Sequence, residues 1–433
     1  MHFLDSGLWE DHIYEQHKVH IKNVGRSAAV TIDNRFKSFP RWSKVHHFED
    51  GISKITFNDG SKNHDISKIF LFAVHDVIPE EVDNAGFTLL RVTRHYINMV
   101  MYAGLNVHTS DTISAGRASV KNFATALKRY ISQTQELDKN WNFIKLHYTR
   151  HCFDDIESKG VLRGLSTKPN EKFHGPLRKI YLRLTNFKGT AKQIMRFEHQ
   201  NVITTQIWDG INLLDAYNKP DPEELDDLEL PVNNDHFRIG SKLKPLAYGV
   251  LKDSDSHLFS HFHIRVSDFM NILLSQSKIP LPGGKRIKFN LDDTIVPYQF
   301  LKINYESLET WRVATDLLQC NPNFQNAPRF DFIIFATVTG PVFAQLRYLF
   351  VCTVAEIQYP IALIQAYKVV HAQPQVDREL GLLRVRKERA TELISVQSII
   401  RGAVLIPASN DPLLSDEMLV WDVLDGDMFL QLK

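Results

Sequence analysis

The sequence predicts an α+β protein in which a mostly helical N-terminal half precedes a small C-terminal β-barrel or curled antiparallel sheet. Up to about residue 215, apolar residues recur at spacings of three and four, the period of amphipathic helices. From Arg329 onward, short segments rich in β-branched and aromatic residues alternate with turn residues, which is typical of strands. With 43% hydrophobic and 23% charged residues, the composition is that of an ordinary globular protein.

Three segments carry the helical prediction. Residues 65–78 and 86–105 each show an apolar stripe, and Gly104 is placed to end the second helix. Residues 114–133 form a third stripe, and Ser114 is placed to open that helix. We therefore assign residues 1–215 to one helical region.

The remaining chain divides into three regions by composition. Residues 216–260 contain four prolines between Asn218 and Pro245 and many acids, so we expect an acidic linker or long surface loop. Residues 261–328 read as a mixed helical connector, with one helix at 265–276 and another, capped by Ser307, at 307–320. Residues 329–433 contain about six strand-like segments and form the expected C-terminal β-domain.

The cysteines and the hydropathy pattern indicate the compartment. Cys152, Cys320 and Cys352 are odd in number and far apart, which gives no disulfide framework and suits a reducing compartment. No apolar run approaches the roughly 20 residues needed to span a bilayer. We expect an intracellular protein, nuclear or cytoplasmic, without a membrane partner.

Charge is segregated along the chain although the net charge is only +1. Between Lys159 and Arg196 there are ten Lys or Arg and one acid, Glu171, whereas residues 209–229 carry eight acids and one Lys. Exposed cations on a helix bind DNA phosphates independently of sequence. The alternative is a solvated helix face that pairs with the neighbouring acidic segment. The cations we assign to DNA binding are Lys168, Lys172, Arg178, Lys179, Arg183, Lys188, Lys192 and Arg196.

Three motifs carry a resemblance to a known family. They are "WNFIKLH" at 141–147, "KGVLR" at 159–163 and "NEKFH" at 170–174. Together with the sequence around them, they resemble the Plavaka-type transposases of fungal CACTA-like DNA transposons. The likeness covers nearly the whole chain and implies that it is the C-terminal portion of such a transposase, truncated upstream.

The resemblance implies a DDE-type, RNase H-like enzyme in which three carboxylates hold two Mg²⁺ ions. By position, Glu171 matches the third acid. The strands that carry the first acid are absent, and Asp5 does not stand at the usual position of the remaining acid. One carboxylate cannot organise two metals. We therefore expect a catalytically incomplete chain without a cofactor, in which Glu171 binds metal only if the upstream acids exist. From the residues alone, Glu171 is a first-turn acid behind an Asn170 N-cap.

A second function class remains open, namely a domesticated protein-interaction module that acts through residues 329–433. Small β-domains of this size bind peptides, and four aromatic residues could line such a pocket. They are Tyr348, Tyr359, Tyr367 and Trp421.

Overall fold

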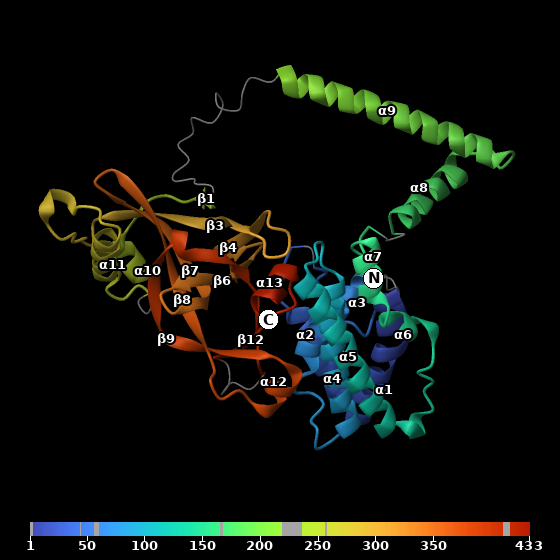
Figure 1. Ribbon diagram of the computed structural model, residues 1–433. Coiled ribbons are helices and arrows are strands. Elements are labelled where there is room, and N and C mark those ends of the chain that lie inside the picture. Colours follow the sequence, from blue (N-terminus) through green and yellow to red (C-terminus); the bar gives the residue numbers. More distant parts are fainter. Residues whose placement is uncertain are drawn as a thin grey trace. The chain divides into compact units, whose positions relative to one another are not determined.

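The computed structural model describes residues 3–43, 45–55, 60–164, 168–218, 236–255, 258–409 and 416–433 (Figure 1). The chain forms two compact units, one made of Met1–Val161 and Val232–Lys433 and the other of Leu162–Pro231. The described residues have an α+β fold, with nine of thirteen α helices before residue 219 and a curled antiparallel sheet after it.

The N-terminal part of the first unit is helical. They are η1 (Phe3–Tyr14, a π-helix), α1 (Glu15–Val24), α2 (Arg26–Ser38), α3 (Gly60–Val74), α4 (Asn84–Ala103), α5 (Ser110–Gln133), α6 (Ile144–Thr149) and α7 (Cys152–Lys159). The helices expected at 65–78 and 86–105 are confirmed as α3 and α4, and Gly104 ends α4. The third begins earlier than expected, because Thr109 rather than Ser114 caps α5 in a capping box with Thr112.

Aromatic packing fixes η1 against α3 and α4. Trp9 is fully buried; its ring stacks on Tyr96 with centroids 5.6 Å apart and meets the edge of Phe70 at 5.5 Å. The buried His17 Nε2 lies 2.7 Å from the Thr93 hydroxyl. The start of the described chain therefore belongs to the helical core.

The twelve strands of the described residues pair antiparallel throughout. They are β1 (Phe237–Lys242), β2 (Leu246–Ala247), β3 (Thr294–Glu306), β4 (Val313–Phe324), β5 (Ala327–Phe330), β6 (Phe332–Thr337), β7 (Gly340–Val354), β8 (Ile357–Val369), β9 (Leu383–Ser395), β10 (Ile399–Ala403), β11 (Leu405–Pro407) and β12 (Glu417–Val420). The main order is β11-β12-β9-β8-β7-β3-β4-β5; β6 joins β7 and β10, and β1 and β2 pair with β3.

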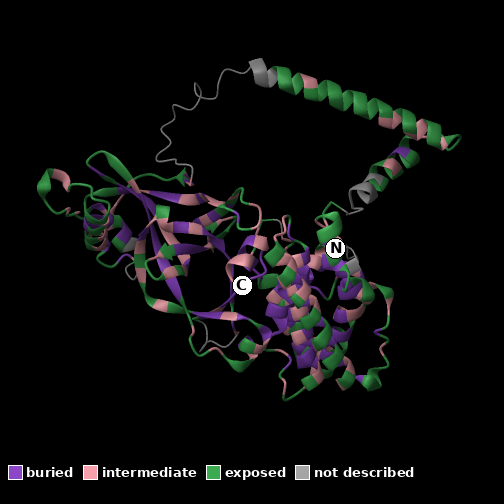
Figure 2. Cartoon of the chain, in the orientation of Figure 1, coloured by how far each residue is buried: buried purple, intermediate pink, exposed green. Residues whose placement is uncertain are grey.

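The β7–β8 hairpin is the centre of the sheet and is covered on both faces. One face packs against α10 (Tyr248–Ser254) and α11 (Phe262–Gln276), as Phe350 and Leu363 show, while Leu349 and Ile364 point into the interior of the curl. Burial on both faces explains why β8 is a nearly continuous apolar run. In Figure 2 the buried residues follow these strands and the packed helices.

Two expectations about the connector and the linker need correction. The helix predicted at 307–320 is wrong, because residues 307–312 form the turn into β4. Strands begin at Phe237, within the range expected to be a linker; residues 219–235 of that range lie outside the described residues. The sheet therefore includes five strands that begin before Arg329.

Helices and sheet of the first unit are joined by buried polar contacts. Lys68 of α3 donates to the Leu424 carbonyl at 2.7 Å, and the Trp421 indole donates to the Lys68 carbonyl at 3.2 Å. His75 Nε2 lies 3.0 Å from the Ala408 carbonyl. The first unit also contains two short helices, α12 (Gln375–Leu380) and α13 (Gly426–Gln431).

The second unit contains α8 (Lys168–Leu184) and α9 (Thr190–Asn218). The Gln193 side chain orders the turn between them, since its Oε1 accepts from the Asn186 amide at 3.1 Å and its Nε2 donates to Asn186 Oδ1 at 2.6 Å. Gly189 supplies the positive φ of 59° that this turn requires.

Candidate nucleic-acid interface

Glu171 is the fourth residue of α8, which begins at Lys168 rather than after an Asn170 cap. The N-cap prediction for Asn170 is therefore wrong, although Glu171 does stand in the first turn. The side chains of Lys168, Glu171 and Lys172 lie outside the described residues, so their predicted roles stay predictions.

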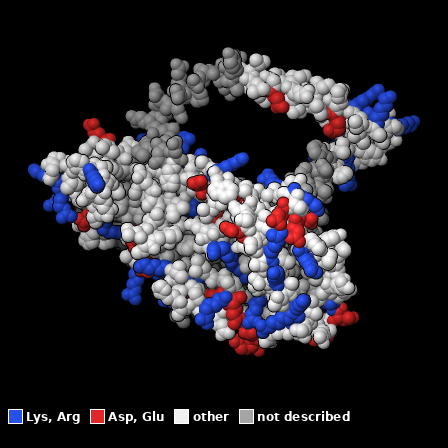
Figure 3. Space-filling view, in the orientation of Figure 1, with Lys and Arg blue, Asp and Glu red and all other residues white. Residues whose placement is uncertain are grey.

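The other six predicted DNA-binding cations are all exposed. None of them forms an ion pair with a carboxylate of the described residues. In Figure 3, Lys and Arg side chains gather where α8 meets α9. We call this set the α8–α9 basic surface; it comprises Arg178, Lys179, Arg183, Lys188, Lys192 and Arg196.

Helical periodicity aligns these cations. Lys179 and Arg183 are four residues apart on α8, and Lys192 and Arg196 are four apart on α9, so each pair shares one helix face. Lys188 lies in the turn between the helices. Among the described side chains of 174–214, only two acids, Glu198 and Asp209, accompany the six cations. The local charge is therefore strongly positive.

Large apolar side chains on α8 and α9 are also exposed. Leu177, Ile180, Tyr181 and Leu184 recur at the spacing of an apolar helix face, but of these only Ile180 is buried. On α9, Met195 is 70% and Trp208 59% exposed. A stripe of apolar residues does not by itself say whether a neighbouring element covers it.

The described residues do not fit a two-Mg²⁺ centre. They contain no group of three or more His, Cys, Asp or Glu side chains that could hold a metal ion. Asp5 is fully buried in the helical core, where its carboxylate lies 3.3 Å from His64 Nδ1. Asp5 and Glu171 belong to different compact units. We therefore derive no metal-dependent step.

The four aromatic residues expected to line a peptide pocket are mostly core residues. Trp421 is fully buried beside Lys68, and Tyr367 packs edge-on against Phe332 with centroids 5.7 Å apart. Tyr348 and Tyr359 pack against the cluster around α11. These four residues do not line one pocket, because Trp421 follows β12 and packs beside Lys68 of α3, whereas Tyr348, Tyr359 and Tyr367 pack on β7 and β8.

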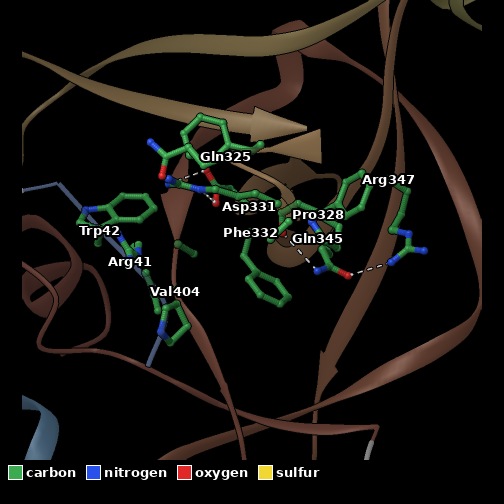
Figure 4. Close-up of a pocket in the computed structure, with 15 residues that line it drawn as sticks. Arg41, Trp42, Gln325, Pro328, Asp331, Phe332, Gln345, Arg347 and Val404 are labelled. Carbon is green, nitrogen blue, oxygen red and sulfur yellow. Dashed lines mark hydrogen bonds and ion pairs between the residues drawn. The ribbon is translucent and has the colours of Figure 1, made fainter. Parts of the chain in front are cut away.

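A different aromatic cavity, which the sequence did not reveal, lies in the first unit (Figure 4). We call it the Trp42 pocket; its volume is about 630 Å³. It is lined by residues 40–42, 324–325, 327–332, 345 with 347, and 403–404. Because these segments are far apart in the chain, no local motif could have indicated the cavity.

A buried charge cluster lies near the junction of helices and sheet. The Arg401 guanidinium donates to Asp425 at 2.6 and 3.1 Å, lies 3.4 Å from Asp316, and stands over the Tyr305 ring. Burial raises the pKa of Asp316 to about 6, although Arg401 opposes the shift. Burial also acts to raise the pKa of Asp425, but the hydrogen bonds and charge of Arg401, together with the Met428 amide and the charge of Lys68, outweigh burial and hold that pKa below its ordinary value. These charges satisfy one another, which indicates a structural role.

No family model, curated protein or solved structure matches this chain. Among the described residues, no helix combines the length and apolar character that crossing a membrane requires.

Proposed function

We propose that this protein is a transposase-derived DNA-binding protein and that the α8–α9 basic surface contacts the phosphates of duplex DNA. The observation that carries the proposal is the exposure of six cations without an ion-paired carboxylate among the described residues. Cations that already pair with acids would have to break those pairs before binding DNA. Within the described part of the chain, these six cations have no such ion pair to break before they bind DNA.

The binding we propose is independent of base sequence. Each Lys or Arg that contacts a phosphate releases condensed counterions, so affinity falls as salt rises. The two pairs at i, i+4 and the turn lysine present charge along both helices instead of at one point. Such an arrangement follows a phosphate backbone and leaves the bases unread.

The transposase origin rests on the three motifs at 141–147, 159–163 and 170–174. In this proposal α8 descends from the helix that brings the third acid, Glu171, to an RNase H-like active site. The described residues bring no group of three or more potential metal ligands together, so the proposal is for DNA binding and includes no cutting or joining step.

The test compares two triple variants of the full chain on a fluorescent duplex of random sequence. Arg178→Ala/Lys179→Ala/Arg183→Ala removes three cations of the α8–α9 basic surface. Arg238→Ala/Lys242→Ala/Lys244→Ala removes three cations that are likewise exposed, from the segment around β1. The two variants therefore have the same net charge. We expect the first variant to lose about tenfold or more in affinity at low salt and the second to change little.

Equal losses in both variants would contradict the assignment to α8–α9, because they would show that only the total charge matters. If the wild-type protein does not bind the duplex, the alternative of a protein-interaction module in 329–433 takes its place.

A further inference from the structure

We infer that the Trp42 pocket binds an unstacked nucleotide, with the base held by aromatic rings and the phosphate by arginines. The pocket lies wholly within the first unit, so this inference is independent of the α8–α9 basic surface. Its volume of about 630 Å³ falls within the range of about 300–1,000 Å³ that is usual for small-molecule sites.

Aromatic side chains from three separate segments converge on the pocket. Trp42 follows α2, Phe324 ends β4, and Phe330 and Phe332 flank the junction of β5 and β6. All four are partly exposed rather than buried. Arg329 lies over the Phe324 ring at 5.1 Å and Arg347 over the Phe330 ring at 5.3 Å. A base would stack on the ring surfaces that these guanidinium groups leave uncovered, because every base has a π-face.

The arginines of the pocket provide the positive charge. Arg329 is engaged, since it makes two hydrogen bonds to Asp331 at 2.9 and 3.1 Å. Arg347 lies over the Phe330 ring at 5.3 Å, and its Nη1 donates to the Gln345 amide oxygen at 3.3 Å. A guanidinium has five N–H donors, so Arg347 retains donors for a phosphate.

Arg41 adds a second available cation at the opposite side of the pocket in Figure 4. It pairs with Glu49 at 2.7 Å, but its side chain is 55% exposed and that of Glu49 is 70% exposed. Exposed pairs of this kind contribute little, so a ligand phosphate can replace the carboxylate.

The same residues disfavour other ligand classes. Among the described lining residues Asp331 is the only acid, and Arg329 neutralises it, so a cationic ligand finds no free carboxylate there. An extended peptide would need unpaired backbone groups at the strand junction. There the Phe330 carbonyl accepts from Gln345 at 3.2 Å, and the amide and carbonyl of Asp331 bond to Gln319 and Leu346.

The wall that carries Phe324 is held by a tight turn. Gln325 and Asn326 both have positive φ, 51° and 68°, as in a type I′ hairpin turn, and Phe324 pairs with Ala327 across it. This geometry fixes the ring before a ligand arrives. Gln325 places an exposed side-chain amide at the turn beside the pocket, where it can bond a base edge.

The experiment titrates the full chain, in the Arg178→Ala/Lys179→Ala/Arg183→Ala background, with AMP, adenosine, inorganic phosphate and a short oligo-dT, and follows tryptophan fluorescence. The background weakens binding at α8–α9. We expect AMP or oligo-dT to quench fluorescence more strongly than adenosine or phosphate alone. Binding of AMP identifies a free nucleotide as the ligand, and binding of oligo-dT without AMP identifies single-stranded nucleic acid.

Matched variants locate the site. We expect Trp42→Phe to remove most of the quenching. We expect Arg347→Gln or Arg41→Gln to weaken binding by about 10- to 150-fold, the loss of a hydrogen bond to a charged group. The controls Trp311→Phe and Arg389→Gln change exposed residues outside the pocket and should behave like the parent. Lack of quenching by both nucleotide probes, or equal effects of pocket and control variants, would overturn the inference. So would an acidic peptide that binds the pocket when AMP and oligo-dT do not.

Discussion

Arg94 of α4 and Asp422, two residues after β12, form a buried ion pair across 328 positions of sequence. Arg94 Nη1 donates to Asp422 Oδ1 at 3.0 Å, Nη2 contacts the other carboxylate oxygen, and the two side chains are only 4% and 9% exposed. This bidentate pair joins the helical part to the end of the sheet. It is one reason why residues 1–161 and 232–433 form a single compact unit.

Removal of one partner of this pair should destabilise the protein strongly. We expect Arg94→Met to lower the free energy of unfolding by about 3–5 kcal/mol, because the buried Asp422 carboxylate loses both guanidinium contacts and keeps only the more distant Lys433 Nζ, at 4.0 Å, among the described residues. The double variant Arg94→Met/Asp422→Leu should recover a large part of that loss. Urea denaturation of the three proteins gives the values, and a single variant within about 1 kcal/mol of the wild type would contradict the prediction.

Asp316 should make stability depend on pH in the mildly acidic range. Its pKa in the folded protein is about 6, above the ordinary value of 3.8, so folding favours the protonated carboxyl. The associated stabilisation is complete below about pH 4 and is lost as the pH rises through about 6. Relative to Asp316→Asn, the wild type should lose about 1–3 kcal/mol between these values. Denaturation at pH 4, 5, 6 and 7 measures this, and a difference that stays constant with pH would exclude the effect.

The start of α5 can be tested by two hydroxyl substitutions. Thr109 accepts from the Thr112 amide at 3.2 Å in the capping box, whereas Ser114 lies inside the helix and is exposed. We expect Thr109→Ala to cost about 1 kcal/mol of stability and Ser114→Ala to cost nothing. The reverse order, measured by thermal or urea denaturation, would place the cap at Ser114.

The sequence revealed α3, α4, α5, α8, α11 and the C-terminal strands but misread β4. In β4, the inward positions are Asp316, Leu318 and Cys320, while Leu317 is 53% exposed. A buried acid and an exposed leucine hide the alternation that identifies a strand, and the remaining apolar residues mimic a helix. Asp316 is tolerated there because the Gly402 amide and Arg401 are close to it, which the local sequence cannot show.

The candidate sites were predictable to different degrees. The α8–α9 basic surface follows from local sequence, because its cations lie within nineteen consecutive residues of two helices. The Trp42 pocket was not predictable, since Trp42 and Arg347 come to line the same cavity only after the sheet has curled. The aromatics chosen from sequence were core residues, whereas the pocket uses Phe324 and Phe332 at the ends of strands.

Glu171 should contribute little to what this chain does on its own. We expect Glu171→Gln to leave the stability unchanged within about 0.5 kcal/mol and to leave DNA affinity equal or slightly higher, because it removes a negative charge near phosphates. Strand cleavage in Mg²⁺ should be equal, at background level, for both proteins. Mg²⁺-dependent cleavage by the wild type that the variant lacks would show a complete metal site.

The most direct test of the proposed function is the salt dependence of duplex DNA binding. If all six cations of the α8–α9 basic surface contact phosphates, the logarithm of the association constant should fall with log salt at a slope of about −5. The Arg178→Ala/Lys179→Ala/Arg183→Ala variant should show a slope of about −3, and the Arg238→Ala/Lys242→Ala/Lys244→Ala control should keep the wild-type slope. A wild-type slope near zero, or the same slope in the first variant as in the wild type, would contradict DNA binding through α8–α9.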